Sequence, residues 1–378
     1  MRNLKLMLLL LLGLPLTALA QTTTLQSRII DLSGNGIPGV EITETATCAT
    51  FSGTASSTTT KFTDANGSFN WPSPNLPGGG SQCAVTVEYT FAIKKEGYFF
   101  TRSTFIYRPP PGLPFGSPPV DQRLPLIHGT TLPPWTSVSA ASFNLDRVVT
   151  SEMITAAFGV NLAATTETAT SSPLPTALAG RRVIVLDSQG VERAAPLLFV
   201  SPAQVNYVTP PDLAAGSAAI KLVDENNNVI KAGFVEIRKI APAIFTANAD
   251  GRGVPAAVIL HVRPDGEWNY ELVAQFDEAQ KRFVPAPLDL GPESEFVVLA
   301  LFGTGWRQVT DVSQVNVSIG TPGAQVSGSI EYVGKQPTFE GLDQINVRLP
   351  RTLIGRGEVS VSVFINYVGA NVVQLKFQ

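Results

Sequence analysis

Apolar and polar residues alternate with a period of two along much of this chain. The alternation is clearest in AVTVEYTFAI at 84–93. A period of two is typical of half-buried β-strands, because successive side chains of a strand point to opposite faces of the sheet. Turn residues separate the alternating segments, as in TDANGSF at 63–69, where Asp64 can bond its own backbone and Gly67 supplies a positive φ. The pattern predicts an all-β protein built from many short strands.

Part of the pattern occurs twice in the second half of the chain. Gln204, Asn206 and Pro210 return 140 residues later as Gln344, Asn346 and Pro350, and Phe158-Gly159 returns 144 residues later as Phe302-Gly303. A near-constant offset between distant landmarks indicates two related structural units in tandem. SEMITAAF, which ends at Phe158, fits either a helix or a strand. Its counterpart SEFVVLALF is rich in Val and Phe, so we predict strands in both places.

Composition agrees with this organisation. Only 15% of the 378 residues are charged, whereas Thr, Val, Ser, Pro and Gly are abundant, as in proteins made of short strands and tight turns. The length suggests two to three domains. We predict a first unit at 21–107, a Pro- and Gly-rich linker at 108–136, and tandem units at 137–240 and 241–378. The last unit is longer because we expect inserted hairpins at 258–287.

Residues 1–20 have the features of a secretory signal peptide. Arg2 and Lys5 form a positive start, an apolar run follows at 6–14, and Ala18-Leu19-Ala20 is a small-residue cleavage site. The apolar run is short for a membrane anchor, since the hydrocarbon core of a bilayer is ~30 Å thick. We therefore expect a secreted, periplasmic or cell-surface protein with no membrane span after signal cleavage.

The net charge bears on whether the protein binds nucleic acid, and the cysteines bear on whether it has a disulfide or a metal site. The formal net charge is −3 and no basic run is present, which argues against nucleic acid as a partner. We expect a disulfide between Cys48 and Cys83, because exported proteins meet oxidising conditions. Two buried free thiols are the alternative. Neither cysteine has a second ligand at short spacing, so we expect no metal site there and no cofactor.

Three motifs in the first unit resemble the carboxypeptidase regulatory-like domain. They are Gly36-Ile37-Pro38-Gly39-Val40, Thr63-Asp64-Ala65-Asn66-Gly67-Ser68-Phe69 and Lys95-Glu96-Gly97-Tyr98. The first has one residue fewer between Pro38 and Val40 than the usual motif of that family. The resemblance implies a small transthyretin-like β-sandwich. Zinc carboxypeptidases carry this domain as an appendage, but no zinc ligand set accompanies it here.

The stretch from Ser137 to Gln378 resembles the Solibacter-type C-terminal domain of exported bacterial proteins. This resemblance implies two tandem immunoglobulin-like sandwiches, and it brings no known activity or catalytic residue. One departure is VTSEMI near residue 150, where such domains usually have a Pro-Gly turn. The matching segments are SAASF at 139–143, PLP at 173–175, PLLFVSP at 196–202, QVN at 204–206, APAIFT at 241–246 and QINV at 344–347.

Few residues point to catalysis. The only histidines are His128, at the end of the predicted linker, and His261, which we expect to be a facing residue in the strand-like VILHVR. The nucleophile elbow G-x-S-x-G and the zinc motif H-E-x-x-H are absent from the sequence. Acidic residues concentrate in turns. The Asp64 turn could offer oxygens to calcium, but it lacks the further acids of an EF-type loop.

Trp268 and Tyr270 are the candidate ligand-binding residues. They follow the turn Pro264-Asp265-Gly266, outside the repeated pattern, and two residues that are two apart on a strand point the same way. Trp and Tyr are enriched at interfaces, so this pair could stack on sugar rings or on a protein. The alternative is that both rings cover the neighbouring sheet.

These observations favour a non-enzymatic, exported array of β-sandwiches, one transthyretin-like and two immunoglobulin-like. Its role would be cell-surface structure, or binding of an extracellular polysaccharide or a surface protein. One alternative is an extracellular hydrolase whose carboxylates lie in loops. Another is an assembly or adhesion module that uses exposed strand edges.

Overall fold

The computed structural model describes residues 25–50, 53–71, 87–100, 104–107, 127–130 and 135–378. Within these ranges the chain is almost entirely β-structure, and its helical segments are short 3-10 turns, so the predicted all-β class is confirmed. None of the helices found there is long and apolar enough to cross a membrane. The predicted signal peptide, Cys83 and most of the predicted linker lie outside the described residues, so the Cys48–Cys83 disulfide stays a prediction.

The N-terminal region, residues 25–130, has two sheets. Their strand orders are β4-β1-β8-β6 and β3-β2-β5-β7. Both sheets contribute to one apolar cluster, in which the buried Trp71 ring packs edge-to-face against Tyr89 and Phe91. The strands are β1 (Leu25–Ile30), β2 (Glu41–Thr50), β3 (Gly53–Phe62), β4 (Ser68–Trp71), β5 (Val87–Lys94), β6 (Phe99–Phe100), β7 (Thr104–Tyr107) and β8 (Ile127–Thr130).

Strand β8 differs from the sequence-based expectation, which placed residues 127–130 in the linker. It pairs in parallel with β1, with Ile127 opposite Ile29, and both side chains are buried in the apolar cluster. Burial of Ile127 explains why the chain returns to this region after its Pro-rich stretch. The linker prediction could not anticipate this pairing, because a four-residue strand carries little pattern of its own.

The first repeat, residues 135–240, packs two five-stranded sheets around its own core. The strand orders are β12-β15-β16-β11-β9 and β10-β18-β17-β13-β14. SEMITAAF contains strand β11, so its prediction as a strand rather than a helix is confirmed. The strands are β9 (Thr136–Ser139), β10 (Val148–Val149), β11 (Ile154–Phe158), β12 (Glu167–Thr168), β13 (Arg182–Leu186), β14 (Glu192–Ala195), β15 (Leu197–Val200), β16 (Gln204–Val208), β17 (Gly216–Val223) and β18 (Val229–Ile237).

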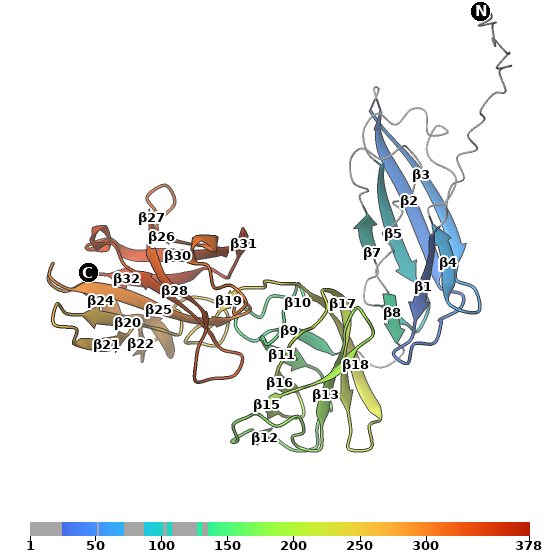
Figure 1. Cartoon of the computed structure of the whole chain (residues 1–378), viewed down its shortest axis with the longest axis horizontal. Coiled ribbons are helices and arrows are strands. Elements are labelled where there is room, and N and C mark those ends of the chain that lie inside the picture. Colours follow the sequence, from blue (N-terminus) through green and yellow to red (C-terminus); the bar gives the residue numbers. More distant parts are fainter. Residues whose placement is uncertain (1–24, 51–52, 72–86, 101–103, 108–126, 131–134) are drawn as a thin grey trace, which may run out of the picture.

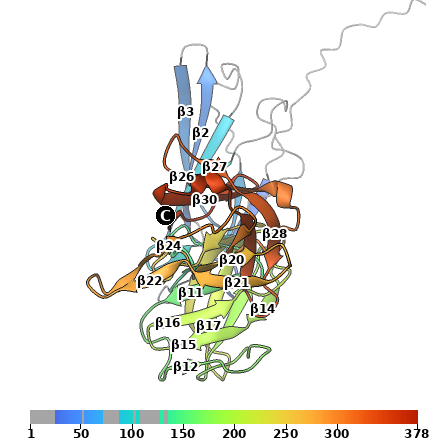
Figure 2. The same ribbon diagram turned by 90° about the vertical axis from the view of Figure 1, so that its left-hand side faces the viewer.

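The second repeat, residues 241–378, has sheets in the orders β21-β20-β25-β29-β28 and β24-β32-β30-β26-β27. Short strands β19 and β31 pair with β25 and β30, and β22 and β23 form a separate hairpin, which projects from the repeat in Figure 2. The strands are β19 (Ala243–Ile244), β20 (Ala257–Val262), β21 (Trp268–Leu272), β22 (Ala274–Asp277), β23 (Arg282–Pro285), β24 (Pro287–Leu288), β25 (Phe296–Thr304), β26 (Val315–Gly320), β27 (Val326–Ser327), β28 (Ser329–Lys335), β29 (Asp343–Arg348), β30 (Gly357–Ile365), β31 (Val368–Gly369) and β32 (Val373–Phe377).

The two repeats share the strand order of their cores, in which β15-β16-β11-β9 matches β28-β29-β25-β20, whereas β12 and β21 have no counterpart in the other repeat. In each, the last strand pairs in parallel with a two-residue strand, β10 with β18 and β24 with β32. In each, a β-bulge lies opposite an asparagine, Asn206 or Asn346. The repeated glutamines, Gln204 and Gln344, each donate from Nε2 to the Oδ1 of the asparagine two residues on, at 2.8 and 2.7 Å, because side chains two apart on a strand share a face.

The inserted segment is shorter than the sequence suggested. Strand β20 belongs to the repeated core, because it pairs with β25 as β9 pairs with β11. The insertion therefore runs from 263 to 286 and contributes β21, β22 and β23. The predicted turn at Pro264-Asp265-Gly266 does connect β20 to β21, and a turn that begins at Asp277 connects β22 to β23.

The repeats are joined by specific contacts, and they lie side by side in Figure 1. The backbone N–H of Ile154 donates to Thr304 Oγ1 at 2.9 Å, and that hydroxyl donates to the carbonyl of Gly341 at 2.8 Å. Gly341 has a φ of 79°, and a Cβ there would lie 2.5 Å from Ile154 Cγ1. The loop around Gly341 therefore covers the outer face of β11, and a side chain at this position would force the repeats apart.

Candidate binding face on strand β21

The turn between β20 and β21 fixes which residues stand on the surface. The N–H of Arg263 donates to the carbonyl of Glu267 at 2.9 Å, and the N–H of Gly266 donates back to Arg263 at 3.0 Å. Gly266 has a φ of 87°, which suits glycine. This tight turn sets the register so that Trp268, Tyr270 and Leu272 stand opposite Val262, Leu260 and Val258 of β20.

All five residues of β21 are exposed. Trp268, Tyr270 and Leu272 share one side of the strand, and we call these three side chains the β21 face. Their exposed fractions are 60%, 63% and 63%. The prediction that the two rings share one side of a strand is confirmed by the register. Both rings lie on the surface rather than in a core. Whether they bind a ligand stays a prediction at this point.

The β21 face continues across the sheet. Outward residues of β20 are Val258, Leu260 and Val262, all half-buried, and Phe296 of β25 is 38% exposed. Strands of antiparallel sheets usually alternate apolar-inward with polar-outward, so apolar residues on both sides of β20 and β25 are a departure. The uninterrupted apolar runs AVIL and FVVLALF carry this signal in the sequence.

Charge on this sheet face is paired. The Arg348 guanidinium lies 4.2 Å from the centre of the Phe296 ring and its Nε lies 2.8 Å from Glu331 Oε1. Cation–π contact and ion pairing hold Arg348 flat against the sheet. The outer surface is therefore largely apolar from β21 to β25, and on β29 the charge of Arg348 is balanced by a carboxylate.

The opposite side of β21 is anchored by His261, which is buried and faces inward rather than acting at the surface. Its Nε2 lies 2.6 Å from Glu271 Oε1, and its Nδ1 lies 3.7 Å from Glu295 Oε2. Glu295 also lies 3.9 Å from Arg263 Nε. Both ring nitrogens face carboxylates, so this cluster ties β21 to the neighbouring strands and has the geometry of a structural anchor.

The remaining sequence candidates do not join this site. Asp64 Oδ1 accepts hydrogen bonds from the N–H groups of Asn66 and Ser68, both at 2.8 Å, so its turn uses the carboxylate internally. Among the described residues, no three or more His, Cys, Asp or Glu side chains group as metal ligands would. His128 belongs to β8, and the position of its side chain is outside what the structure describes.

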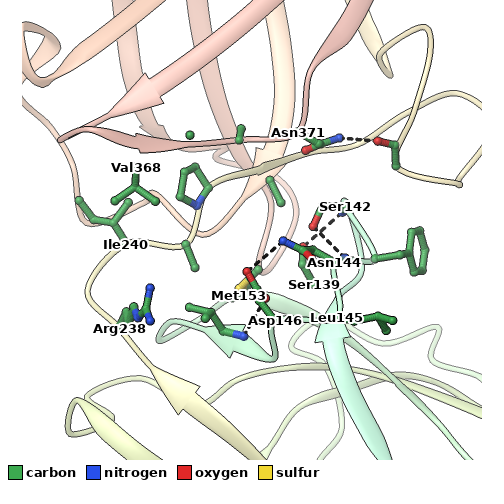
Figure 3. A pocket seen from close by; sticks show the side chains of 18 of the residues that line it. Ser139, Ser142, Asn144, Leu145, Asp146, Met153, Arg238, Ile240, Val368 and Asn371 are labelled. Carbon is green, nitrogen blue, oxygen red and sulfur yellow. Dashed lines mark hydrogen bonds between the residues drawn. The ribbon is translucent and has the colours of Figure 1, made fainter. Parts of the chain in front are cut away.

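A hollow that the sequence did not indicate lies between the repeats (Figure 3). It has a volume of about 660 Å³ and is lined by Asp146, Arg238 and Asn371 among others. Asp146 accepts from Asn144 Nδ2 and from the N–H of Val148, both at 3.0 Å. The Asn371 side-chain amide binds Ile244 and Gly251 backbone at 2.8 to 3.0 Å. Because the side chains of Asp146 and Asn371 bond the protein itself, and Arg238 is exposed, the hollow is a weaker ligand site than the β21 face.

A strong electrostatic perturbation lies between the repeats and away from the β21 face. Burial raises the pKa of Asp343 to about 6, although Arg307 acts in the lowering direction. Arg307 Nε lies 3.0 Å from Asp343 Oδ1, and its Nη1 lies 3.3 Å from Glu152 Oε1 of the first repeat. This three-residue cluster is a contact between repeats rather than a reactive site.

Comparison with the models of known protein families finds no match for this chain, and comparison with curated proteins finds no match either. The two family resemblances therefore rest on the motifs quoted above. A functional assignment has to come from the geometry of the β21 face.

Proposed function

We propose that this chain is an exported, non-enzymatic β-sandwich protein that binds a neutral polysaccharide at the cell surface through the β21 face. The observation that carries the proposal is the exposure of Trp268 and Tyr270 at successive outward positions of a regular strand. Their Cα atoms are separated by two residue steps, which is about 7 Å along a strand. Sugar rings have apolar C–H faces, and two adjacent aromatic rings can stack on consecutive sugars.

The surroundings of the rings support a neutral and extended ligand. Arg348 is the charged side chain of the face that points outward near Phe296, and Glu331 pairs with it. The hydrogen-bonded amides of Gln344 and Asn346 lie on the same side of the sheet and can meet sugar hydroxyls. The strand is at the edge of its sheet, so a polymer can extend past it in both directions.

The position of the β21 face on an inserted segment also favours a role in ligand binding. The repeated strands must keep their inward residues in order to fold, whereas residues 263–286 have no counterpart in the first repeat. Binding residues are often carried on segments that a rigid scaffold holds in place. Support for export comes from the sequence of residues 1–20. Support for a non-catalytic role comes from His261, whose ring nitrogens face the two carboxylates that anchor the strand.

Binding to a glycan array and to insoluble neutral polysaccharides tests this function. We expect the purified protein to bind at least one of them, and the double change Trp268→Ala, Tyr270→Ala to weaken binding at least about tenfold, or ~1.4 kcal/mol. Each stacked ring contributes on the order of 1 kcal/mol. Tyr367→Ala is the matched control, because this fully exposed tyrosine lies in the turn between β30 and β31.

Two results would reject the proposal. One is that no polysaccharide is bound, or that the double variant binds as well as the unmodified protein. The other is release of new reducing ends from a bound polysaccharide, which would support the hydrolase alternative instead.

A further inference from the structure

Strand β21 is an open edge of its sheet, and the register shows which backbone groups are free. In an antiparallel pair, hydrogen-bonded and non-hydrogen-bonded residue pairs alternate. Arg263 N–H donates to Glu267 at one end of the hairpin, and Val273 N–H donates to Ala257 at the other end at 3.5 Å. Both hydrogen bonds fix the same alternation of bonded and non-bonded pairs, in which the backbone groups of Asn269 and Glu271 bond β20.

It follows that the N–H and C=O groups of Trp268, Tyr270 and Leu272 point away from β20. No other strand in the described part of the chain pairs with β21. The residues whose side chains form the β21 face are thus also those whose backbone groups line the open edge. Unpaired backbone groups on an apolar strand are a template for pairing with another chain.

Three other edge strands in the described repeats, β28, β14 and β24, carry features that block such pairing. Strand β28, at the opposite edge of the same sheet, has Glu331, Lys335 and a bulge. Strand β14 has Glu192 and Arg193, and β24 is two residues long and begins with a proline. Charges, bulges, prolines and short length are common protections of sheet edges. In β21, positions 268, 270 and 272 carry none of these, and its one charged residue, Glu271, is paired with His261.

We propose that two copies of this chain associate by antiparallel pairing of their β21 strands, with the two-fold axis at Tyr270. In this register Tyr270 stands opposite Tyr270 of the second copy, and Trp268 stands opposite Leu272. All three pairs are of the hydrogen-bonded kind, because their free groups face each other. The partner of each β21 strand is thus the β21 strand of a second copy. This pairing gives hydrogen-bond partners to the free backbone groups of both edges, in a closed, isologous interface.

The side chains are complementary in this register. Trp268 meets Leu272 and the tyrosines meet each other, and aromatic or apolar cross-strand pairs stabilise a sheet. On the other side Glu271 stands opposite Asn269, so no two carboxylates oppose each other. Glu271 is also already paired with His261 of its own chain. A single short strand buries less than the roughly 1,200 Å² of a stable complex, so we expect association at micromolar or higher concentrations.

This inference rests on the free backbone edge and stands apart from polysaccharide binding, which rests on the exposed rings. The two are compatible, since pairing would join both β21 faces into one surface with four aromatic rings. A bivalent surface would strengthen binding to a repeating polymer.

Sedimentation velocity over a range of protein concentrations tests the pairing. We expect the unmodified protein to dimerise, and Tyr270→Lys and Tyr270→Glu each to raise the dimer dissociation constant at least about tenfold, because like charges would then face each other. A mixture of the two variants should form a dimer again. Such rescue requires residue 270 of one copy to lie opposite residue 270 of the other.

Leu272→Pro is the second variant, because it removes a free N–H from the edge and leaves the bonds of Asn269 and Glu271 to β20 in place. It should also weaken the dimer while keeping both rings. The proposal is overturned if the unmodified protein stays monomeric at all concentrations. It is also overturned if both single-charge variants dimerise as before, or if their mixture gives no rescue. Polysaccharide binding by a monomer would leave the proposed function standing while removing this one.

Discussion

At the scale of single residues, one turn recurs through the molecule. An aspartate begins it, its carboxylate accepts from the N–H groups two and four residues later, and the residue three places on has a positive φ. The four examples begin at Asp31, Asp64, Asp187 and Asp224. The positive-φ residues are Gly34, Gly67, Gly190 and Asn227. The sequence predicted the turn at 63–69, because aspartate and glycine have local roles that need no tertiary contact.

Asp187 is the buried one of these four aspartates. Burial acts to raise its pKa, but hydrogen bonds from Val191, Ala214, Arg193 and Gln189 outweigh it, and the pKa lies below its ordinary value of 3.8. We expect Asp187→Ala to lower the free energy of unfolding by about 3 kcal/mol at pH 7, since bonds to a charged group are lost. Urea unfolding measures this.

The pH dependence gives a second readout of the same change. Because the folded-state pKa is lowered, the contribution of Asp187 is present above about pH 4 and is lost as pH falls through the folded-state pKa. The difference in stability between the unmodified protein and Asp187→Ala should therefore shrink under strong acid. A difference that stays constant from pH 7 to pH 2 would contradict this account.

At the scale of elements, the sequence was most informative where a strand had clear alternation of apolar and polar residues, or a counterpart in the other repeat. It predicted β11 from its likeness to β25, and it placed Trp268 and Tyr270 on one side of one strand. It assigned β20 to the insertion, because the pairing of β20 with β25 is a long-range property that no local pattern states. The bulges opposite Asn206 and Asn346 could not be predicted from the sequence either, because a bulge depends on which strand pairs with its own.

The His261 anchor predicts a local effect on β21. Glu271→Ala removes the carboxylate that lies 2.6 Å from His261 Nε2. We expect the amide protons of Asn269 and Glu271, which bond β20, to exchange with solvent at least about tenfold faster, because the strand opens locally more often. Hydrogen exchange followed by NMR measures this.

The amide protons of β25 are the internal control for this experiment. They lie in the centre of the same sheet and should keep their exchange rates. An equal acceleration in β21 and β25 would show that Glu271 stabilises the whole repeat, and the anchor would not be local.

At the scale of the whole molecule, the contacts between the repeats could not be predicted from the sequence. Gly341, Thr304 and Arg307 are ordinary residues in a sequence, and only the packing of one repeat on the other brings them to Ile154 and Glu152. The hollow in Figure 3 arises in the same way. The tandem organisation itself was readable, because the repeated landmarks recur at a near-constant spacing.

Asp343 makes the stability of the second repeat depend on pH. Burial raises its pKa from 3.8 to about 6, so the folded protein holds this proton more tightly than the unfolded chain does. Its contribution to stability is therefore greatest below about pH 4 and falls by about 3 kcal/mol as pH rises to about 6. Asp343→Asn, which cannot ionise, should lack this decline when urea unfolding is measured at pH 4, 5, 6 and 7. An unchanged decline in the variant would assign it to other groups.

The central claim is that the rings of β21 are kept on the surface for a partner and not for the fold. The free energy of unfolding of Trp268→Ala, Tyr270→Ala tests it most directly, with Trp306→Ala as the reference. Trp306 is 1% exposed, and its loss should reduce stability by about 3 to 5 kcal/mol. We predict that the double variant loses less than about 1 kcal/mol, as is usual for surface changes. A loss as large as that of Trp306→Ala would show that the rings belong to the core, and the claim would be wrong.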